Sequence, residues 1–229
     1  MVIMKLRSHL KNVLVSPERK ARKILAGPFR NIMMGLSLRN QTQTYLGLFE
    51  KEIHPWLYRL SKGISTAIDI GAAPGEYTLY FLTKTEATKV FAFEPDVNLF
   101  PCLHENLRLN GLDQLQRLEL FSKFLGLFDT AHEIRLDSLA TSILGPCFIK
   151  MDVDGGEEQI FEGAKTINVL ADVRWLIETH SYQLESLCEG IVSAAGFQTR
   201  IIPNAVWRVF VPEKRPIEHN RRLAAWTSQ

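Results

Sequence analysis

Two apolar segments of the sequence end in pairs of charged or titratable residues. The segment "CFIKMDV" carries Lys150 and Asp152, and the segment "VRWLIETH" carries Glu178 and His180. The members of each pair are two positions apart, so in an extended strand both side chains lie on the same face. Charged residues are rare in buried strands, and their presence there indicates a catalytic role. We expect these four residues to form one catalytic cluster; an ion pair of Lys150 with Asp152 or Glu178 that fixes the strand ends is the alternative.

This cluster has residues for two kinds of chemistry. His180 can be neutral near pH 7 and is the first candidate for a general base, with Asp152 second. Asp152, Glu178 and His180 together offer a set of oxygen and nitrogen ligands for a divalent cation, which would lower the pKa of a bound hydroxyl. The sequence leaves both mechanisms open, although a metal is not the expected cofactor.

A glycine-rich turn follows another apolar segment. In "AIDIGAAPGEYTLYF" a strand-like run leads into Gly71 and Gly75, which allow the backbone to approach a ligand closely. The spacing differs from the G-x-G-x-x-G of dinucleotide sites, and the carboxylates of Asp69 and Glu76 flank the turn. Carboxylates repel phosphate and suit a cation. The turn therefore favours S-adenosylmethionine, which has an ammonium group, a sulfonium group and no phosphate.

An acidic residue also ends the next apolar segment. Glu94 lies 25 residues after Asp69, close to the offset of about 20 residues at which an acid binds ribose hydroxyls. A carboxylate can accept hydrogen bonds from both hydroxyls. We therefore predict that Glu94 binds the cofactor ribose and that Asp96 caps the following helix. The predicted cofactor-binding residues are Asp69, Gly71, Ala72, Gly75, Tyr77, Glu94, Pro95, Ser122 and Asp152.

The pattern after residue 64 predicts the scaffold for these residues. Short apolar runs alternate with amphipathic stretches, which is typical of a mostly parallel sheet with helices on both faces. The expected strands are 64–70, 89–94, 116–124, 147–153, 173–180, 197–202 and 206–211, of which the last two form an antiparallel hairpin, and a short strand falls within 133–139. The expected helices are 75–84, 96–109, 157–170 and 182–195. In such a sheet a ligand lies beyond the carboxyl ends of the strands.

The composition places the chain among ordinary globular proteins. Of its 229 residues, 46% are hydrophobic and 23% are charged, which is outside the range of disordered chains. Its three cysteines are widely spaced and form no C-x-x-C pattern, so we expect them to be reduced. Lys5, Arg7 and Lys11 interrupt the apolar start, and no window reaches the length of a membrane span. A cytoplasmic protein is expected.

Together these motifs resemble the FkbM family of S-adenosylmethionine-dependent methyltransferases. The resemblance covers residues 64–182. It rests on "DIGAAPGEYTL", "VFAFEPD", "LHENLRLN", "IRLDSL", "FIKMDVDGGEEQIFEGA" and "IETH". It implies an α/β, Rossmann-like class I methyltransferase with a seven-stranded sheet, and methylation of a hydroxyl group on a saccharide, polyketide or other small metabolite. The chain departs from the family at Ala73, where Asn is usual, and at Gly156, where Ala is usual.

The first 45 residues have a different character. They contain nine Lys and Arg residues and one acid, and their periodicity predicts short helices broken at Ser16-Pro17 and Gly27-Pro28. We expect a basic helical extension over residues 1–45, before a methyltransferase domain over residues 46–229. Such an extension could pack over the domain or a second subunit as a homo-oligomer, or contact an anionic membrane or glycan.

Two other functions remain open. An RNA ribose 2'-O-methyltransferase is one, because "DIGAAPG" resembles the turn of FtsJ-type enzymes and the N-terminus is basic. The chain has no convincing match to the Lys-Asp-Lys-Glu tetrad of that family, so a nucleic-acid partner is not expected. A cofactor-binding interaction module without catalysis is the other, supported by Ala73 and Gly156.

Overall fold

The computed structural model describes residues 16–170, 172–209 and 221–227. Its centre is a seven-stranded sheet in the order β10-β11-β9-β8-β3-β4-β5. The strands are β3 (Thr66–Ile70), β4 (Lys89–Phe93), β5 (Leu118–Phe121), β8 (Cys147–Asp152), β9 (Val173–Thr179), β10 (Phe197–Ile202) and β11 (Arg221–Thr227). Neighbouring strands are parallel except where β11 pairs with β9 and β10. The predicted seven-stranded, mostly parallel sheet with an antiparallel pair at its C-terminal end is confirmed.

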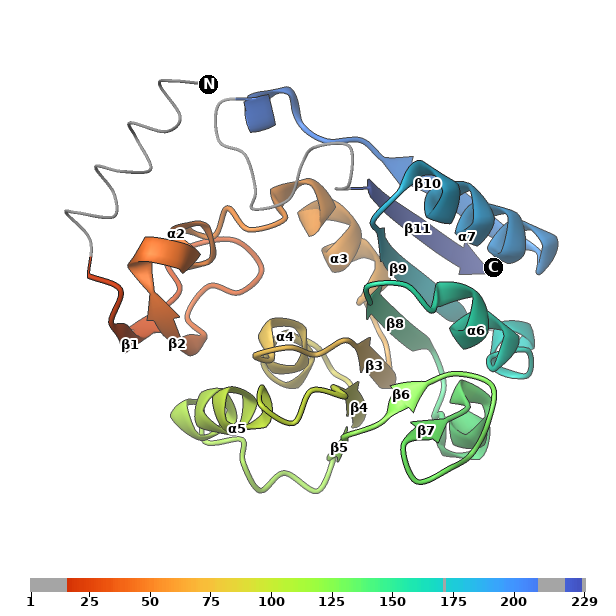
Figure 1. Ribbon diagram of the computed structural model, residues 1–229, viewed down its shortest axis with the longest axis horizontal. Helices are drawn as coiled ribbons and strands as arrows, with labels where there is room; N and C mark the ends of the chain where they lie inside the picture. Colours follow the sequence, from red (N-terminus) through yellow and green to blue (C-terminus); the bar gives the residue numbers. More distant parts are fainter. Residues whose placement is uncertain (1–15, 171, 210–220, 228–229) are drawn as a thin grey trace.

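Helices cover both faces of this sheet, as Figure 1 shows. One face carries α3 (His54–Leu60), α4 (Glu76–Lys84) and α5 (Phe100–Leu109). The other face carries α6 (Glu157–Glu162), α7 (Tyr182–Ala194) and the 3₁₀ segments η2 (Leu136–Ser142) and η3 (Ile167–Val169). Alternate strand residues supply two separate apolar clusters, because successive side chains of a strand point to opposite faces. No helix in the described part of the chain is long and apolar enough to cross a bilayer.

The helix predicted over residues 157–170 is shorter than expected. It ends at Glu162, and the chain turns at Gly163, where a side chain would collide with the backbone oxygen of Gly126. The carboxylate of Asp137 then accepts hydrogen bonds from the backbone N–H groups of Thr166 and Ile167. A contact between distant parts of the chain thus ends the helix before its amphipathic pattern ends.

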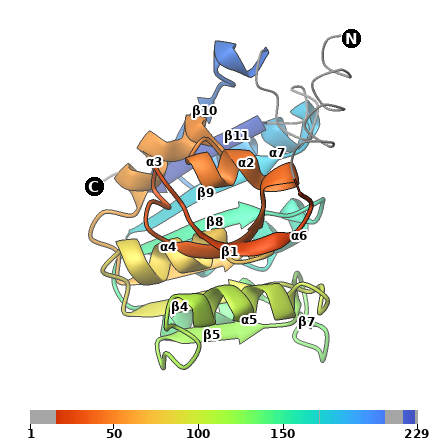
Figure 2. The same cartoon turned by 90° about the vertical axis from the view of Figure 1, so that its left-hand side faces the viewer.

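The N-terminal part differs from the predicted helices. β1 (Arg19–Lys23) and β2 (Met33–Ser37) form an antiparallel hairpin, followed by α2 (Leu38–Leu46) and η1 (Lys51–Ile53). Two asparagines hold β2 in place: Asn106 of α5 accepts a hydrogen bond from the Gly35 N–H at 2.8 Å, and Asn110, which follows the last residue of α5, bonds both backbone groups of Met33. Figure 2 shows β1 and α2 on the α4 side of the molecule. Residues 1–15 lie outside the described residues, and the division of the chain at residue 45 stays a prediction.

The C-terminal hairpin has a different second strand from the predicted one. Val206–Val209 form a 3₁₀ turn, η4, and β10 pairs instead with β11. The reason is Arg208, which is 2% exposed and forms two 2.6 Å contacts with the carboxylate of Glu52. A buried, bidentate ion pair fixes this turn against the N-terminal segment, and residues 210 and 211 of the predicted strand lie outside the described range.

Candidate active site

The glycine turn between β3 and α4 brings its backbone against the end of β8. Gly71 has a φ of 80°, and a side chain there would collide with the backbone oxygen of Asp152. Gly75 has a φ of 97° and precedes the first residue of α4. A side chain on Gly75 would collide with Leu103. Only glycine adopts these conformations at little cost. Both glycines thus permit close packing against protein atoms, the backbone of Asp152 and the side chain of Leu103, and their predicted approach to a ligand stays a prediction.

Glu94 is fixed at the end of β4 by two backbone groups of the chain. One carboxylate oxygen accepts a hydrogen bond from the N–H of Ala73 at 2.8 Å, and the other accepts from the N–H of Asp96 at 2.8 Å. Ala73 itself has a φ of 48°, which is unusual for a residue with a side chain. Each carboxylate oxygen keeps a lone pair for a further donor. The position and orientation suit the predicted binding of ligand hydroxyls.

A cavity of about 560 Å³ lies beyond the carboxyl ends of β3, β4 and β8. Its size is within the range of small-molecule sites, roughly 300–1,000 Å³. Four predicted cofactor residues line it: Gly71, Glu94, Pro95 and Asp152. The other predicted members, Asp69, Ala72, Gly75, Tyr77 and Ser122, are not among the lining residues. The cavity therefore joins the glycine turn, Glu94 and Asp152 into one site.

Asp69 has a supporting position beneath the turn. Its side chain is 1% exposed and accepts a 2.6 Å hydrogen bond from the Thr78 hydroxyl on α4. Burial raises the pKa of Asp69 to about 6. The direct contact of this carboxylate is therefore with helix α4, and Asp69 does not line the cavity.

Lys150 and Glu178 belong to a buried charge network on the α4 side of the sheet. Lys150 is 1% exposed, and its ammonium lies 4.8 Å from the centre of the Tyr77 ring. The Tyr77 hydroxyl donates a hydrogen bond to Glu50, which is 2% exposed. Glu178 is 5% exposed and hydrogen-bonds to Glu50. The two residues are therefore sealed in the protein, and neither lines the cavity.

Glu50 and Glu178 share this network with Arg222 of β11. The guanidinium lies 3.7 Å from Glu50 and 3.9 Å from Glu178. Burial, together with the neighbouring Glu50, raises the pKa of Glu178 well above its usual value. Burial would also raise the pKa of Glu50, but the hydrogen bond to Glu178 and the charges of Lys150 and Arg222 lower it. A hydrogen bond between two carboxyl groups requires one proton, and the raised pKa of Glu178 beside the lowered pKa of Glu50 favours Glu178 as its carrier.

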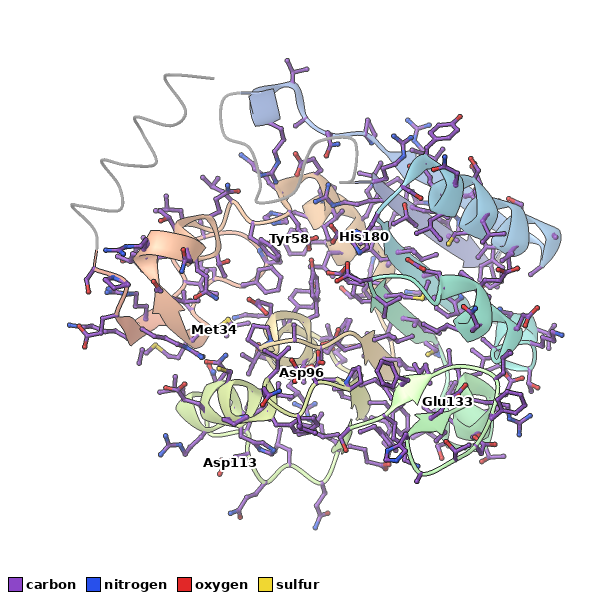
Figure 3. All side chains as sticks on the ribbon, viewed as in Figure 1. Met34, Tyr58, Asp96, Asp113, Glu133 and His180 are labelled. Atoms are coloured by element: carbon purple, nitrogen blue, oxygen red, sulfur yellow. The ribbon has the colours of Figure 1, made fainter. Side chains whose placement is uncertain are left out.

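Asp152 and His180 remain close to the cavity. The Nε2 atom of His180 lies 3.3 Å from Asp152 and 3.4 Å from Asp154, and the side chains of His180 and Asp152 are 13% and 31% exposed. Figure 3 labels His180 in the part of the molecule where β8 and β9 lie. Ligand atoms of Asp152, Glu178 and His180 all lie within 4.8 Å of one another. The structure thus brings the predicted cluster together, with Asp152 and His180 on its accessible side.

Comparison with known proteins identifies this scaffold. The sequence matches no protein-family profile and no curated protein. The structure is similar to methyltransferase FkbM from Methylobacillus flagellatus KT, with 21% identity, a TM-score of 0.53, and coverage of 71% of this chain and 43% of that one. It is also similar to an S-adenosylmethionine-dependent O-methyltransferase from Thermotoga maritima, with 14% identity, a TM-score of 0.50, and coverage of 78% and 65%. This chain has the Rossmann-like methyltransferase fold.

This fold supports more than one reaction. A third similar structure, at 15% identity and a TM-score of 0.50, is precorrin 8w decarboxylase from Methanobacterium thermoautotrophicum, with coverage of 78% of this chain and 90% of that one. The present chain also spans less than half the length of the FkbM methyltransferase. The fold alone therefore does not identify the reaction, and the residues of the site must do so.

Two parts of the site were not predicted from the sequence. The short parallel strands β6 (Phe124–Leu125) and β7 (Glu133–Ile134) contribute three lining residues, among them Glu133, which Figure 3 labels at this pair. Glu50 of the N-terminal segment completes the buried network. A signal for Glu50 was absent because its neighbours Tyr77, Glu178 and Arg222 are far from it in sequence.

Proposed function

We propose that this protein is an S-adenosylmethionine-dependent methyltransferase of the FkbM type that methylates a hydroxyl group on a saccharide, polyketide or other small metabolite. The observation that carries the proposal is the cavity that joins the glycine turn, the oriented carboxylate of Glu94 and the carboxylate of Asp152. A nucleoside needs the glycine turn and the Glu94 carboxylate, and a methyl acceptor needs a polar group such as the Asp152 carboxylate.

The charges of the cavity favour this cofactor over a dinucleotide. Its lining contains four acids and one base: Glu94, Glu133, Asp152, Asp154 and the base Lys123. The Lys123 ammonium already donates a hydrogen bond to the backbone oxygen of Thr130. A pyrophosphate would meet a surplus of negative charge, whereas a ligand with a sulfonium and an ammonium group is attracted. The same surplus opposes the phosphates of an RNA acceptor.

The residues of the site divide the work of methyl transfer. The bound cofactor supplies an activated methyl group. Glu94 would hold its ribose hydroxyls, and the turn at Gly71 lets the ligand approach the backbone closely. Positioning of this kind contributes roughly 7–11 kcal/mol to the barrier reduction of two reacting groups. The protein's main contribution is therefore to hold the reactants in line.

Asp152 and His180 would act on the acceptor. His180 is our first candidate for the base that takes the hydroxyl proton, and Asp152, 3.3 Å from its Nε2 atom, would stabilise the resulting imidazolium. A base contributes a smaller factor than positioning, about 10²–10⁴ in rate. A divalent cation held by Asp152, Glu178 and His180 would serve the same step by lowering the pKa of the hydroxyl.

Calorimetric titration tests the cofactor assignment. We expect S-adenosylmethionine to bind with a micromolar dissociation constant, NAD to bind at least 100-fold more weakly, and Glu94→Gln to weaken the former at least tenfold. Glu86→Gln removes an acid of the same type from an exposed position and is the matched control. Preference for NAD, or an equal loss of affinity in both variants, would contradict the proposal. Confirmed binding would justify a screen of hydroxylated acceptors.

A further inference from the structure

A second cavity, of about 700 Å³, lies at the amino-terminal edge of the sheet. Its lining residues include Pro146 just before β8, Asp172 just before β9, and Trp226 near the end of the antiparallel strand β11. Strand β9 has seven residues, and a strand of that length spans roughly 20 Å. The cavity of the candidate active site lies beyond the carboxyl ends of the strands, so the second cavity is a separate site.

Positive charge is in surplus at this second cavity. Its lining contains three cations, Arg59, Lys62 and Arg174, and one acid, Asp172. Arg174 and Asp172 neutralise each other through two hydrogen bonds, of 2.8 and 2.6 Å. Arg59 and Lys62 have no carboxylate partner among the residues that the structure describes. Two positive charges without a partner at one cavity attract an anion.

Arg174 fixes the backbone that carries these two cations. Its guanidinium donates hydrogen bonds to the backbone oxygens of Leu60, at 2.9 Å, and of Lys62, at 2.7 Å. Leu60 is the last residue of α3, and Arg59 directly precedes it. The ion-paired arginine of β9 therefore anchors the end of α3 at the cavity, and with it the backbone of Arg59 and Lys62.

Two indole rings orient the side chain of Arg59. Its guanidinium carbon lies 4.7 Å from the centre of the Trp226 ring and 5.1 Å from that of the Trp56 ring. The indole N–H of Trp226 donates a 2.9 Å hydrogen bond to Gln198, which holds that ring in place. A cation over an aromatic face is held without use of its N–H groups. In the described part of the chain the Arg59 side chain makes no hydrogen bond, so its planar set of donors can bind an anion through two parallel hydrogen bonds.

We propose that this cavity binds an organic phosphate monoester, with the phosphate on Arg59 and Lys62 and the organic group beside Trp226. A phosphate monoester carries a charge of about −1.5 to −2 near pH 7 and offers three acceptor oxygens, which matches two cations better than the single charge of a carboxylate does. The cavity volume is within the range of small-molecule sites, roughly 300–1,000 Å³. The half-buried indole of Trp226 supplies an apolar surface for the rest of the ligand. This site is independent of the proposed methyl transfer.

Calorimetric titration of the full chain with phenyl phosphate tests the site. We expect one saturable site per chain with a submillimolar dissociation constant, and at least tenfold weaker binding of inorganic phosphate and of phenol. Arg59→Gln and Lys62→Gln should each weaken the binding of phenyl phosphate at least tenfold. Arg30→Gln and Lys84→Gln remove the same two residue types from other exposed positions and should change the affinity by less than twofold.

A measurement on the unmodified protein keeps the proposal testable if a variant fails to fold. In proton–nitrogen NMR spectra, phenyl phosphate should shift the indole N–H signal of Trp226 and leave unchanged that of Trp175, which is 0% exposed. Saturating S-adenosylmethionine should not compete with phenyl phosphate, because its expected site is at the opposite edge of the sheet.

Four results would overturn the phosphate site: absence of saturable binding, an equal loss of affinity in the control variants, an unshifted Trp226 signal, or competition by S-adenosylmethionine. Equal affinity for inorganic phosphate and phenyl phosphate would overturn the organic ligand. Absence of S-adenosylmethionine binding, with phenyl phosphate still bound, would contradict the proposed function and support the separate phosphate site.

Discussion

Glu94 follows the last residue of β4, and Glu178 is near the carboxyl end of β9 in the same sheet. Both side chains are almost completely buried, yet their environments differ. Glu94 is held by two backbone N–H groups from nearby parts of the chain. Glu178 is held by side chains, the carboxyl of Glu50 and the guanidinium of Arg222, that come from opposite ends of the sequence. The glycine turn with Glu94 is thus an arrangement of backbone, and the buried charge network is an arrangement of distant side chains. The two regions should therefore respond differently to substitution.

Gly71→Ala should have the largest effect, because it breaks the backbone region at its tightest contact. The new side chain would meet the backbone oxygen of Asp152 and would occupy a left-handed conformation. We expect a loss of about 4 kcal/mol in the free energy of unfolding and no detectable cofactor binding. Urea denaturation and calorimetry measure the two effects. Wild-type stability in this variant would show that the turn is more adaptable than its contacts indicate.

Glu50→Ala should break the charge network while sparing the glycine turn. It removes the acceptor of the Tyr77 hydroxyl and the partner of Glu178, and leaves Arg222 with one carboxylate fewer. Loss of one partner of a buried charged group costs about 3 kcal/mol. Urea denaturation should show this loss. Cofactor affinity should stay within about threefold of wild type, and an affinity loss as large as that of Glu94→Gln would mean that the two regions are not separate.

Asp69→Asn should change how the free energy of unfolding depends on pH, because Asp69 is a buried carboxyl group between the glycine turn and the charge network. The pKa of Asp69 is about 6 in the folded protein and about 3.9 in an unfolded chain. The folded state therefore binds more protons between pH 4 and 6, so this group makes wild-type stability fall as pH rises through that window. The difference should be of the order of 2 kcal/mol. Urea midpoints of both proteins at pH 4.5 and 7 test it, since Asp69→Asn should remove that part of the slope.

Gly190→Ala should give the smallest effect, and with the opposite sign. Gly190 lies inside α7, is exposed, and has open space where a side chain would be. Alanine at such a position stabilises a helix by roughly 0.5–1 kcal/mol. Thermal unfolding monitored by circular dichroism measures the gain. Compared with Gly71→Ala, this variant separates the effect of a tight backbone contact from that of removing a glycine; a destabilised protein would contradict the expectation.

The prediction of the fold from the sequence succeeded where local patterns govern the chain. The strands that contain Asp69, Asp152 and Glu178, and the strand that ends just before Glu94, were predicted because continuous apolar runs followed by turn residues are local signals. The N-terminal hairpin was wrongly predicted as helix, because its strand β2 is held by side chains far away in sequence, Asn106 of α5 and Asn110 just after it. The second strand of the C-terminal hairpin was misplaced for a similar reason: Glu52 holds Arg208 in a turn.

The sequence by itself determined the alternation of strands and helices, the glycine turn, and the placement of Glu94 and Asp152 at strand ends. These features follow from side-chain periodicity and from backbone conformations that particular residues allow. Only the tertiary structure decided that Lys150 and Glu178 are sealed behind Asp152 and that Glu50 and Arg222 complete their network. The reason is physical: a buried charge is stabilised by whichever opposite charges and donors the fold brings within a few ångströms, and sequence distance carries no information about those neighbours.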